Sequence, residues 1–124
     1  LNEWQDALIQ DVKRFLEERL SFAVAAGIRE ELVCLDPGIG FGKTAAHNFE
    51  LVRRLDELRS LGRPLLVGFS RKSSLGALTG AATGSAAASV GAAVSAYDRG
   101  AAILRVHDVR EHVEALAAAR AVVG

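Results

Sequence analysis

The sequence contains no methionine and only one cysteine among its 124 residues. A translated chain normally begins with methionine, whereas this one begins at Leu1 inside an apparent helix, so we expect a piece of a longer chain. The single cysteine, Cys34, excludes a disulfide framework within the chain. A lone cysteine fits a reducing compartment, and we therefore predict a cytoplasmic protein.

Two further absences narrow the class of protein. The sequence has no signal peptide and no apolar run of about 18 residues, which argues against a membrane span. Fifteen Lys and Arg residues balance fifteen Asp and Glu residues, so neither nucleic acid nor an anionic membrane surface is indicated as a partner. With 50% hydrophobic residues, the composition is that of one globular domain over residues 1–124.

Helices and strands are predicted to alternate in the order α-β-α-β-α-β-α. Apolar residues at helical spacing predict helices, and short apolar runs predict buried strands. The predicted strands are 32–35, 65–69 and 101–106, and the predicted helices are 2–26, 46–61, 85–98 and the segment after Asp108. The strand centres lie about 33 and 36 residues apart, a spacing that indicates an α/β fold with parallel strands and right-handed crossovers.

The periodicity of each predicted helix indicates its apolar side. Apolar residues recur every four positions in the first helix and every three positions, from Phe49 to Leu61, in the second. A capping box of Asp108 and Glu111 is expected to start the last helix. The residues predicted to form the apolar sides of the first, third and last helices are Trp4, Leu8, Ile9, Val12, Phe15, Leu16 and Leu20; Val90, Val94 and Tyr97; and Val109, Val113 and Leu116.

The loop from Asp36 to Thr44, DPGIGFGKT, is the most informative part of the chain. Three glycines in five residues permit positive φ angles and let a ligand approach the backbone. The loop is not a P-loop, because Pro37 stands where a glycine is required, and Lys43 likewise breaks the dinucleotide-binding fingerprint. It is therefore either a ligand-binding turn at a strand end or a tight βα turn without a ligand.

Polar side chains follow all three predicted strands. Asp36 follows the first, the segment 70–73 follows the second, and Arg105 and His107 follow the third. The carboxyl ends of parallel strands lie on one rim, so these side chains can converge. Arg105 and His107 are two residues apart, which places them on one face of a strand, and together they suit an anion such as phosphate or diphosphate.

Each of these residues also has an interpretation without a ligand. Arg105 could instead pair with Asp98 or Asp108, and His107 could be a buried histidine with its hydrogen bonds satisfied. The sequence alone leaves both interpretations open.

The remaining candidates carry paired interpretations as well. Asp36 before a proline is either a turn former or a carboxylate that accepts a guanidine-like N–H pair. Lys72, expected at a helix N-terminus, opposes the helix dipole and is either an active residue or a solvated one. Phe41 between two glycines either covers an aromatic ligand or packs against the sheet. His47 and Asn48 begin a helix, so we expect them to cap it or to be exposed.

Three segments together resemble the dihydropteroate synthases. They are DPGIGFGKT with His47 and Asn48, GFSRKS from Gly68 to Ser73, and RVHDV from Arg105 to Val109, and they stand in that family's order and spacing. The resemblance implies a partial TIM (β/α)₈ barrel, in which this chain starts in the fifth helix and supplies strands six to eight. Because eight strands and roughly 250 residues make such a barrel, residues 1–124 would be the C-terminal half of the domain.

The resemblance also implies an activity. These transferases condense 4-aminobenzoate with 7,8-dihydropterin-6-ylmethyl diphosphate, release diphosphate and form dihydropteroate for folate biosynthesis; sulfonamides compete for the aminobenzoate site. The C–O bond ionises to a pterin methyl cation that the aromatic amine attacks. Such a step needs stabilisation of the leaving group's charge more than a strong base.

The match assigns roles to individual residues. Asp36 would bind the amino-pyrimidine edge of the pterin, and Lys72 its carbonyl and ring nitrogen. Phe41 and Ser73 would line the aminobenzoate pocket. Arg105 would pack on the pterin and, with His107, hold the departing diphosphate. The implied substrate-binding residues are Asp36, Phe41, Gly68, Lys72, Ser73, Arg105 and His107, of which Lys72, Arg105 and His107 are catalytic.

Part of the family's site has no counterpart in these residues. The family's first strands supply an asparagine that helps to hold Mg²⁺, and an aspartate and an asparagine that complete the pterin site. We therefore expect no metal ligand here and place the Mg²⁺ ligands in the N-terminal half. We also predict little or no synthase activity for the chain alone, and a homodimer favoured by its open sheet edges.

Two alternatives remain. One is a non-catalytic half-barrel that binds a pterin or an anion at most. The other is a different pterin-binding barrel, such as a corrinoid-dependent methyltransferase, although methyl transfer gives Arg105 and His107 no diphosphate to receive.

Overall fold

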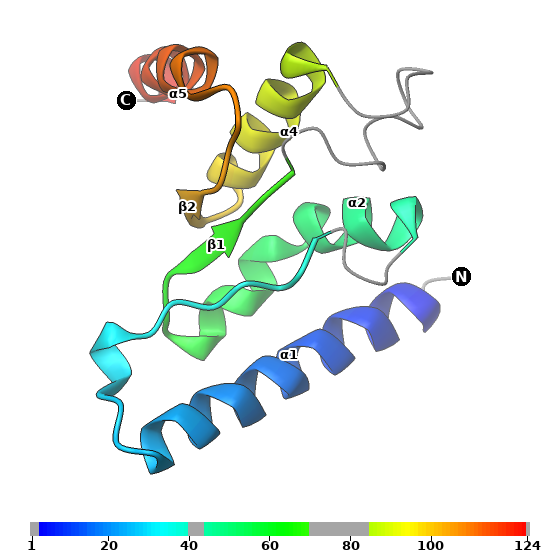
Figure 1. Cartoon of the computed structure of the whole chain (residues 1–124). Coiled ribbons are helices and arrows are strands. Elements are labelled where there is room, and N and C mark those ends of the chain that lie inside the picture. The colour runs from blue at the N-terminus through cyan, green and yellow to red at the C-terminus, as the bar shows by residue number, and fades with distance from the viewer. Residues whose placement is uncertain (1–2, 40–43, 70–84, 124) are drawn as a thin grey trace.

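The computed structural model describes residues 3–39, 44–69 and 85–123. Strands β1 and β2 are parallel, which confirms the predicted α/β fold with parallel strands. No helix in the described part of the chain is long and apolar enough to cross a membrane. In chain order (Figure 1), the elements are α1 (Glu3–Ala25), the 3₁₀ helix η1 (Glu30–Leu32), α2 (Ala45–Arg53), the 3₁₀ helix η2 (Leu55–Leu61), β1 (Leu65–Val67), α4 (Ala86–Asp98), β2 (Ala101–Leu104) and α5 (Val109–Val123).

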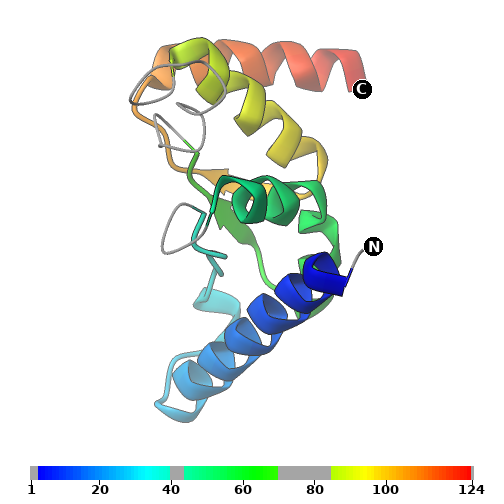
Figure 2. The same cartoon turned by 90° about the vertical axis from the view of Figure 1, so that its right-hand side faces the viewer.

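The first predicted helix is confirmed as α1, which is followed by Gly27 with a φ of 104°. Ile9 and Leu16 are buried, but Trp4 and Phe15 are 44% and 60% exposed. The buried stripe is narrower than predicted because α1 packs on one side only, against α2 and η2, which lie alongside it in both views (Figures 1 and 2).

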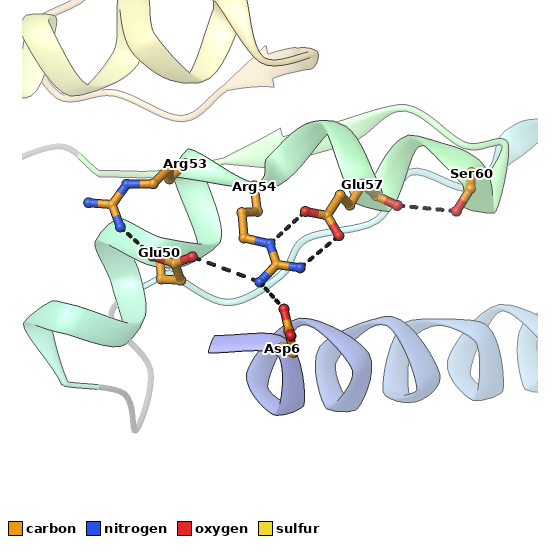
Figure 3. A network of polar contacts seen from close by, with 6 residues as sticks. All are labelled: Asp6, Glu50, Arg53, Arg54, Glu57 and Ser60. Carbon is orange, nitrogen blue, oxygen red and sulfur yellow. Dashed lines mark hydrogen bonds and ion pairs between the residues drawn. The ribbon is translucent and has the colours of Figure 1, made fainter. Parts of the chain in front are cut away.

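Charged side chains also join α1 to the junction of α2 and η2 (Figure 3). Arg54 donates through Nη1 to Oδ1 of Asp6 at 2.7 Å and through Nη2 to Oε1 of Glu57 at 3.0 Å. Glu50, a buried carboxylate, pairs with Arg53 and lies 4.0 Å from Arg54. The hydrogen bonds to Glu57 and Asp6 raise the pKa of Arg54, and the hydrogen bond from Arg54 lowers the pKa of Glu57.

The prediction of a strand over residues 32–35 is wrong. Only Leu35 pairs with the sheet, through an isolated parallel bridge to Leu65. Its backbone N–H donates to the carbonyl of Pro64 at 2.9 Å. Cys34, expected in a buried strand, is exposed, and Leu32 is 66% exposed.

Arg63 supplies the physical reason. Its Nε donates to the carbonyl of Val33 and its Nη2 to the carbonyl of Glu31, each at 2.9 Å. These carbonyls therefore bond to a side chain instead of to a neighbouring strand. The backbone before them turns tightly, because the N–H of Val33 donates to the carbonyl of Glu30. A short apolar run cannot reveal such competition for its backbone groups.

The predicted single helix over 46–61 consists of two helices of different type. The α-helix α2 ends at Arg53, and the 3₁₀ helix η2 follows from Leu55. Leu55 and Leu58 are fully buried. Their every-third spacing matches the three residues per turn of a 3₁₀ helix, so the periodicity already favoured η2 over a longer α-helix.

The parallel pair of strands lies at the centre of the described structure. Leu65 is paired with Ala101 and Val67 with Leu104, and both strands are shorter than predicted. Leu65 and Val67 are each 1% exposed, so β1 is buried as an apolar run predicts.

Helix α4 crosses beside this sheet and starts at Ser85, whose Oγ accepts from the N–H of Ala88 at 3.1 Å. Its buried residues are Ser89, Ala93 and Ala96. The prediction that Val90, Val94 and Tyr97 form the buried side is therefore wrong. Small side chains let α4 lie close to α2 and β2, and the larger ones are left at the flanks.

The last predicted helix is confirmed as α5, which packs against α4. Val109 and Val113 are 60% and 61% exposed, so the predicted apolar side does not face the core. The buried side chain is that of His112, whose Nδ1 lies 2.7 Å from the carbonyl of Asp108. The helix thus meets its neighbour through a face that the apolar pattern did not mark.

Candidate functional site

Asp36 directly follows the bridge residue Leu35 and opens a turn. Its Oδ1 accepts a hydrogen bond from the N–H of Gly38 at 2.8 Å, and Gly38 has a φ of 77°. This is the local turn that Asp before Pro favours. The turn-forming interpretation therefore holds, but it occupies only one of the two carboxylate oxygens.

The other oxygen of Asp36 receives Arg105. Nη1 of Arg105 lies 3.0 Å from Oδ2 of Asp36, across 69 positions of sequence. The backbone N–H of Arg105 donates to the carbonyl of Val67 at 3.0 Å, so the ladder of hydrogen bonds continues one residue beyond β2. The structure thus brings two predicted site residues together, and it pairs Arg105 with a residue that the sequence interpretation had not considered.

Gly68 provides the surface on which the Arg105 guanidinium lies. A Cβ added at Gly68 would lie 2.6 Å from Nη2 and 2.9 Å from Cζ of Arg105, closer than non-bonded atoms approach. Gly68 is itself buried at the end of β1. The glycine of the GFSRKS segment is therefore needed for the packing of Arg105, a reason that the sequence motif alone did not reveal.

The other predicted site residues are not brought together in the described structure. His107 is exposed, and β2 ends at Leu104, so the strand alternation that placed His107 beside Arg105 does not reach it. Phe41, Lys72 and Ser73 lie outside the described residues, and their roles stay predictions.

The start of α2 borders the loop after Asp36. Oγ1 of Thr44 accepts from the N–H of His47 at 3.1 Å, so Thr44 is the capping residue. The prediction that Asn48 caps the helix or is exposed is wrong, because Asn48 is 1% exposed. A signal was present, since Asn48 stands three residues before the buried Leu51 on one helix face. His47 is half-buried, with its ring 5.4 Å from that of Trp4.

A groove of about 430 Å³ separates α1 from the turn at Asp36. Val12, Phe15 and Pro37 give it a mainly apolar lining, and Asp36 stands at its side. Phe15 was predicted to lie in the core; it falls off the every-fourth spacing of α1, and this was the signal for its exposure. Asp36 therefore borders an apolar surface on one side and Arg105 on the other.

The chemical capacity of this site rests on a carboxylate and a guanidinium that both reach solvent. The Asp36 side chain is 34% exposed and that of Arg105 is 49% exposed. The carboxylate can accept an N–H pair from a planar ring, and the guanidinium can donate to an anion. In the part of the chain that the structure describes, no group of three His, Cys, Asp or Glu residues could hold a metal ion.

Comparisons with known proteins agree with this picture. The chain is 40% identical over 109 residues to the dihydropteroate synthase of Haemophilus influenzae, covering 87% of this chain and 40% of that protein. It is 47% identical over 106 residues to a probable bifunctional folylpolyglutamate synthase/dihydropteroate synthase of Halobacterium salinarum, covering 86% of this chain and 13% of the relative. The chain thus spans well under half the length of these curated relatives.

Solved structures give the same result. Dihydropteroate synthase from Xanthomonas albilineans, in complex with 7,8-dihydropteroate, matches with a TM-score of 0.90 and 46% identity over 93% of this chain and 46% of that one. The enzyme from Stenotrophomonas maltophilia matches with a TM-score of 0.89 and 48% identity. The family model described as "Pterin binding enzyme" matches residues 2–107. The chain therefore belongs to the family of pterin binding enzymes, and the resemblance to dihydropteroate synthases noted in its sequence is confirmed.

Proposed function

We propose that this chain forms part of the substrate site of a dihydropteroate synthase. The whole enzyme would be a transferase of folate biosynthesis that condenses 4-aminobenzoate with 7,8-dihydropterin-6-ylmethyl diphosphate and releases diphosphate. One observation carries the proposal: Asp36 and Arg105, from two strand ends, meet over the bare backbone of Gly68. A flat ring with N–H donors and an anionic arm is the kind of ligand that such a site accommodates.

The chain's own residues would divide the work as follows. Asp36 accepts N–H groups from the pyrimidine edge of the pterin and so fixes the orientation of the ring. Arg105 donates to the diphosphate and stabilises the negative charge that grows as the C–O bond breaks. The family resemblance assigns Lys72 to the pterin, Phe41 and Ser73 to the aminobenzoate, and His107 to the diphosphate beside Arg105.

The same proposal covers the architecture of the domain. We assign residues 1–124 to the C-terminal half of a (β/α)₈ barrel, with strands six to eight and their helices. The parallel pair β1–β2, the bridge at Leu35, and a match that covers 93% of this chain but 46% of a dihydropteroate synthase support this assignment. Solved relatives include one with 4-aminobenzoic acid and one in a sulfonamide drug complex, which fits the proposed substrates.

Cofactor, assembly and location are part of the proposal. The described residues offer no set of Mg²⁺ ligands, so we place those ligands in the part of the relatives that this chain does not span, and we derive no step through the metal. We place the protein in the cytoplasm because its lone cysteine suits a reducing compartment. A homodimer through an open sheet edge stays a prediction that sedimentation velocity can check.

The first experiment is a calorimetric titration of the chain with a non-hydrolysable pterin diphosphate analogue. We expect binding by the unsubstituted chain, and at least about tenfold weaker binding by Gly68→Ala, because the added methyl group displaces the Arg105 guanidinium. Gly91→Ala is the matched control, since a Cβ there meets nothing within 4 Å. Absence of binding by the unsubstituted chain would favour the non-catalytic alternative, and equal binding by both variants would contradict the proposed site.

A further inference from the structure

Both oxygens of the Asp36 carboxylate are engaged. Oδ1 accepts from the N–H of Gly38 at 2.8 Å, and Oδ2 accepts from Nη1 of Arg105 at 3.0 Å. The proposed function asks these two side chains to face different parts of a ligand, namely its ring and its anionic arm. In the ligand-free structure they neutralise each other instead.

We infer that Asp36 is a positioning residue for Arg105, and that anion binding exchanges the ion-pair partner of Arg105 from Asp36 to diphosphate. This inference rests on the proposed function, because it concerns the same site. It adds a resting contact that restrains the guanidinium until an anion replaces the carboxylate.

The attachment of Arg105 suits such an exchange. Its backbone is fixed, because its N–H donates to the carbonyl of Val67 at 3.0 Å, whereas 49% of its side chain is exposed. Beneath the guanidinium lies Gly68, which has no side chain to trap it from the side. The head group can therefore turn while its anchor stays in place.

The charges favour the exchange once an anion arrives. Asp36 offers Arg105 one carboxylate oxygen in a contact that solvent screens, and exposed ion pairs of this kind are weak. Diphosphate offers more negative charge and several acceptor oxygens to the planar fork of a guanidinium. An N–H pair from a ring would at the same time give Asp36 replacement hydrogen bonds.

A double-mutant cycle with inorganic diphosphate tests the exchange at low ionic strength, where such pairs are least screened. Asp36→Asn keeps an oxygen for the N–H of Gly38 but removes the charge that restrains Arg105. We expect it to bind diphosphate about three- to tenfold more tightly than the unsubstituted chain. In the background of Arg105→Gln, the same substitution should give no gain.

The remaining arms separate the possible outcomes. Asp56→Asn removes one exposed charge from η2, far from Arg105 in sequence, and should leave diphosphate affinity unchanged. An equal gain from Asp36→Asn with and without Arg105 would mean that Asp36 acts only through its net charge, which overturns the exchange but leaves the proposed function intact. Absence of diphosphate binding in every protein would overturn the anion site itself, and the exchange with it.

Discussion

Helices α1 and α5 lie at opposite ends of the described structure, and they are held in different ways (Figures 1 and 2). Helix α1 places Ile9 and Leu16 in the core and is tied to η2 by the ion pair of Asp6 with Arg54. Helix α5 buries His112, while Val122 and Val123 near its end are 87% and 73% exposed. Two helices with similar apolar patterns thus contribute very differently to the core.

The difference shows what a periodic pattern can and cannot indicate. Periodicity states that a helix has an apolar side, but the neighbours decide whether that side is covered. For α1 the neighbours are α2 and η2, whereas α5 meets α4 alone through a groove lined by Val94, Ala115 and Ala118, among others. Stability should therefore depend more on α1 than on α5, and three substitutions test this comparison.

The largest effect is expected from Ile9→Ala in α1. Ile9 is 0% exposed within the core cluster, and truncation of a fully buried isoleucine costs about 2–5 kcal/mol of unfolding free energy through lost burial and the cavity left behind. Leu116→Ala in α5 is the matched change, and because Leu116 is only half-buried we expect about 1 kcal/mol or less. Urea unfolding followed by circular dichroism measures both. Equal losses would show that the two ends carry equal weight.

Glycines after the helices sharpen the comparison at an intermediate scale. Gly27 after α1 and Gly100 after α4 have nearly equal φ angles, 104° and 108°, so alanine should cost each about 1–2 kcal/mol in backbone strain. A Cβ at Gly27 meets nothing within 4 Å, whereas one at Gly100 would lie 2.5 Å from Cδ of Arg59. Gly100→Ala should therefore cost about 1 kcal/mol more, because Arg59 must leave its preferred rotamer. Thermal unfolding of both variants checks this, and equal melting temperatures would contradict it.

The elements whose neighbours are close in sequence were the most predictable. Helix α1 and the parallel order of β1 and β2 followed from spacing alone. The strand over 32–35 was mispredicted because Arg63, thirty positions from Val33, takes up the carbonyls of that segment. No local pattern contains that information.

The candidate site divides in the same way. The positions of Asp36 and Arg105 at strand ends could be predicted from the order of the elements. Their contact with each other could not, and neither could the role of Gly68 beneath the guanidinium, because both depend on distances across the sheet. Composition and motif thus identified the residues, while packing determined which of them meet.

The smallest expected effect concerns pH and the charged contacts of α1. The hydrogen bond from Arg54 lowers the pKa of Glu57 below its ordinary value of 4.5. A carboxyl with a lowered folded-state pKa stabilises the fold fully above that ordinary value, and the stabilisation is lost as the pH falls through the folded-state pKa. Because 42% of the Glu57 side chain is exposed, solvent screening limits the effect to about 0.2–1 kcal/mol.

Glu57→Gln should accordingly reduce the unfolding free energy at pH 7, and the difference from the unsubstituted chain should shrink as the pH falls below 4.5. Glu114→Gln in α5 is the control, because Glu114 is exposed and has no ion pair with another described residue. Urea unfolding between pH 3 and pH 7, about the range in which carboxyl groups titrate, measures both variants. A difference that persists at low pH would mean that Glu57 acts through packing instead of charge. A pH-dependent loss in both variants would mean that the charged contacts of α1 add nothing beyond what α5 has without them.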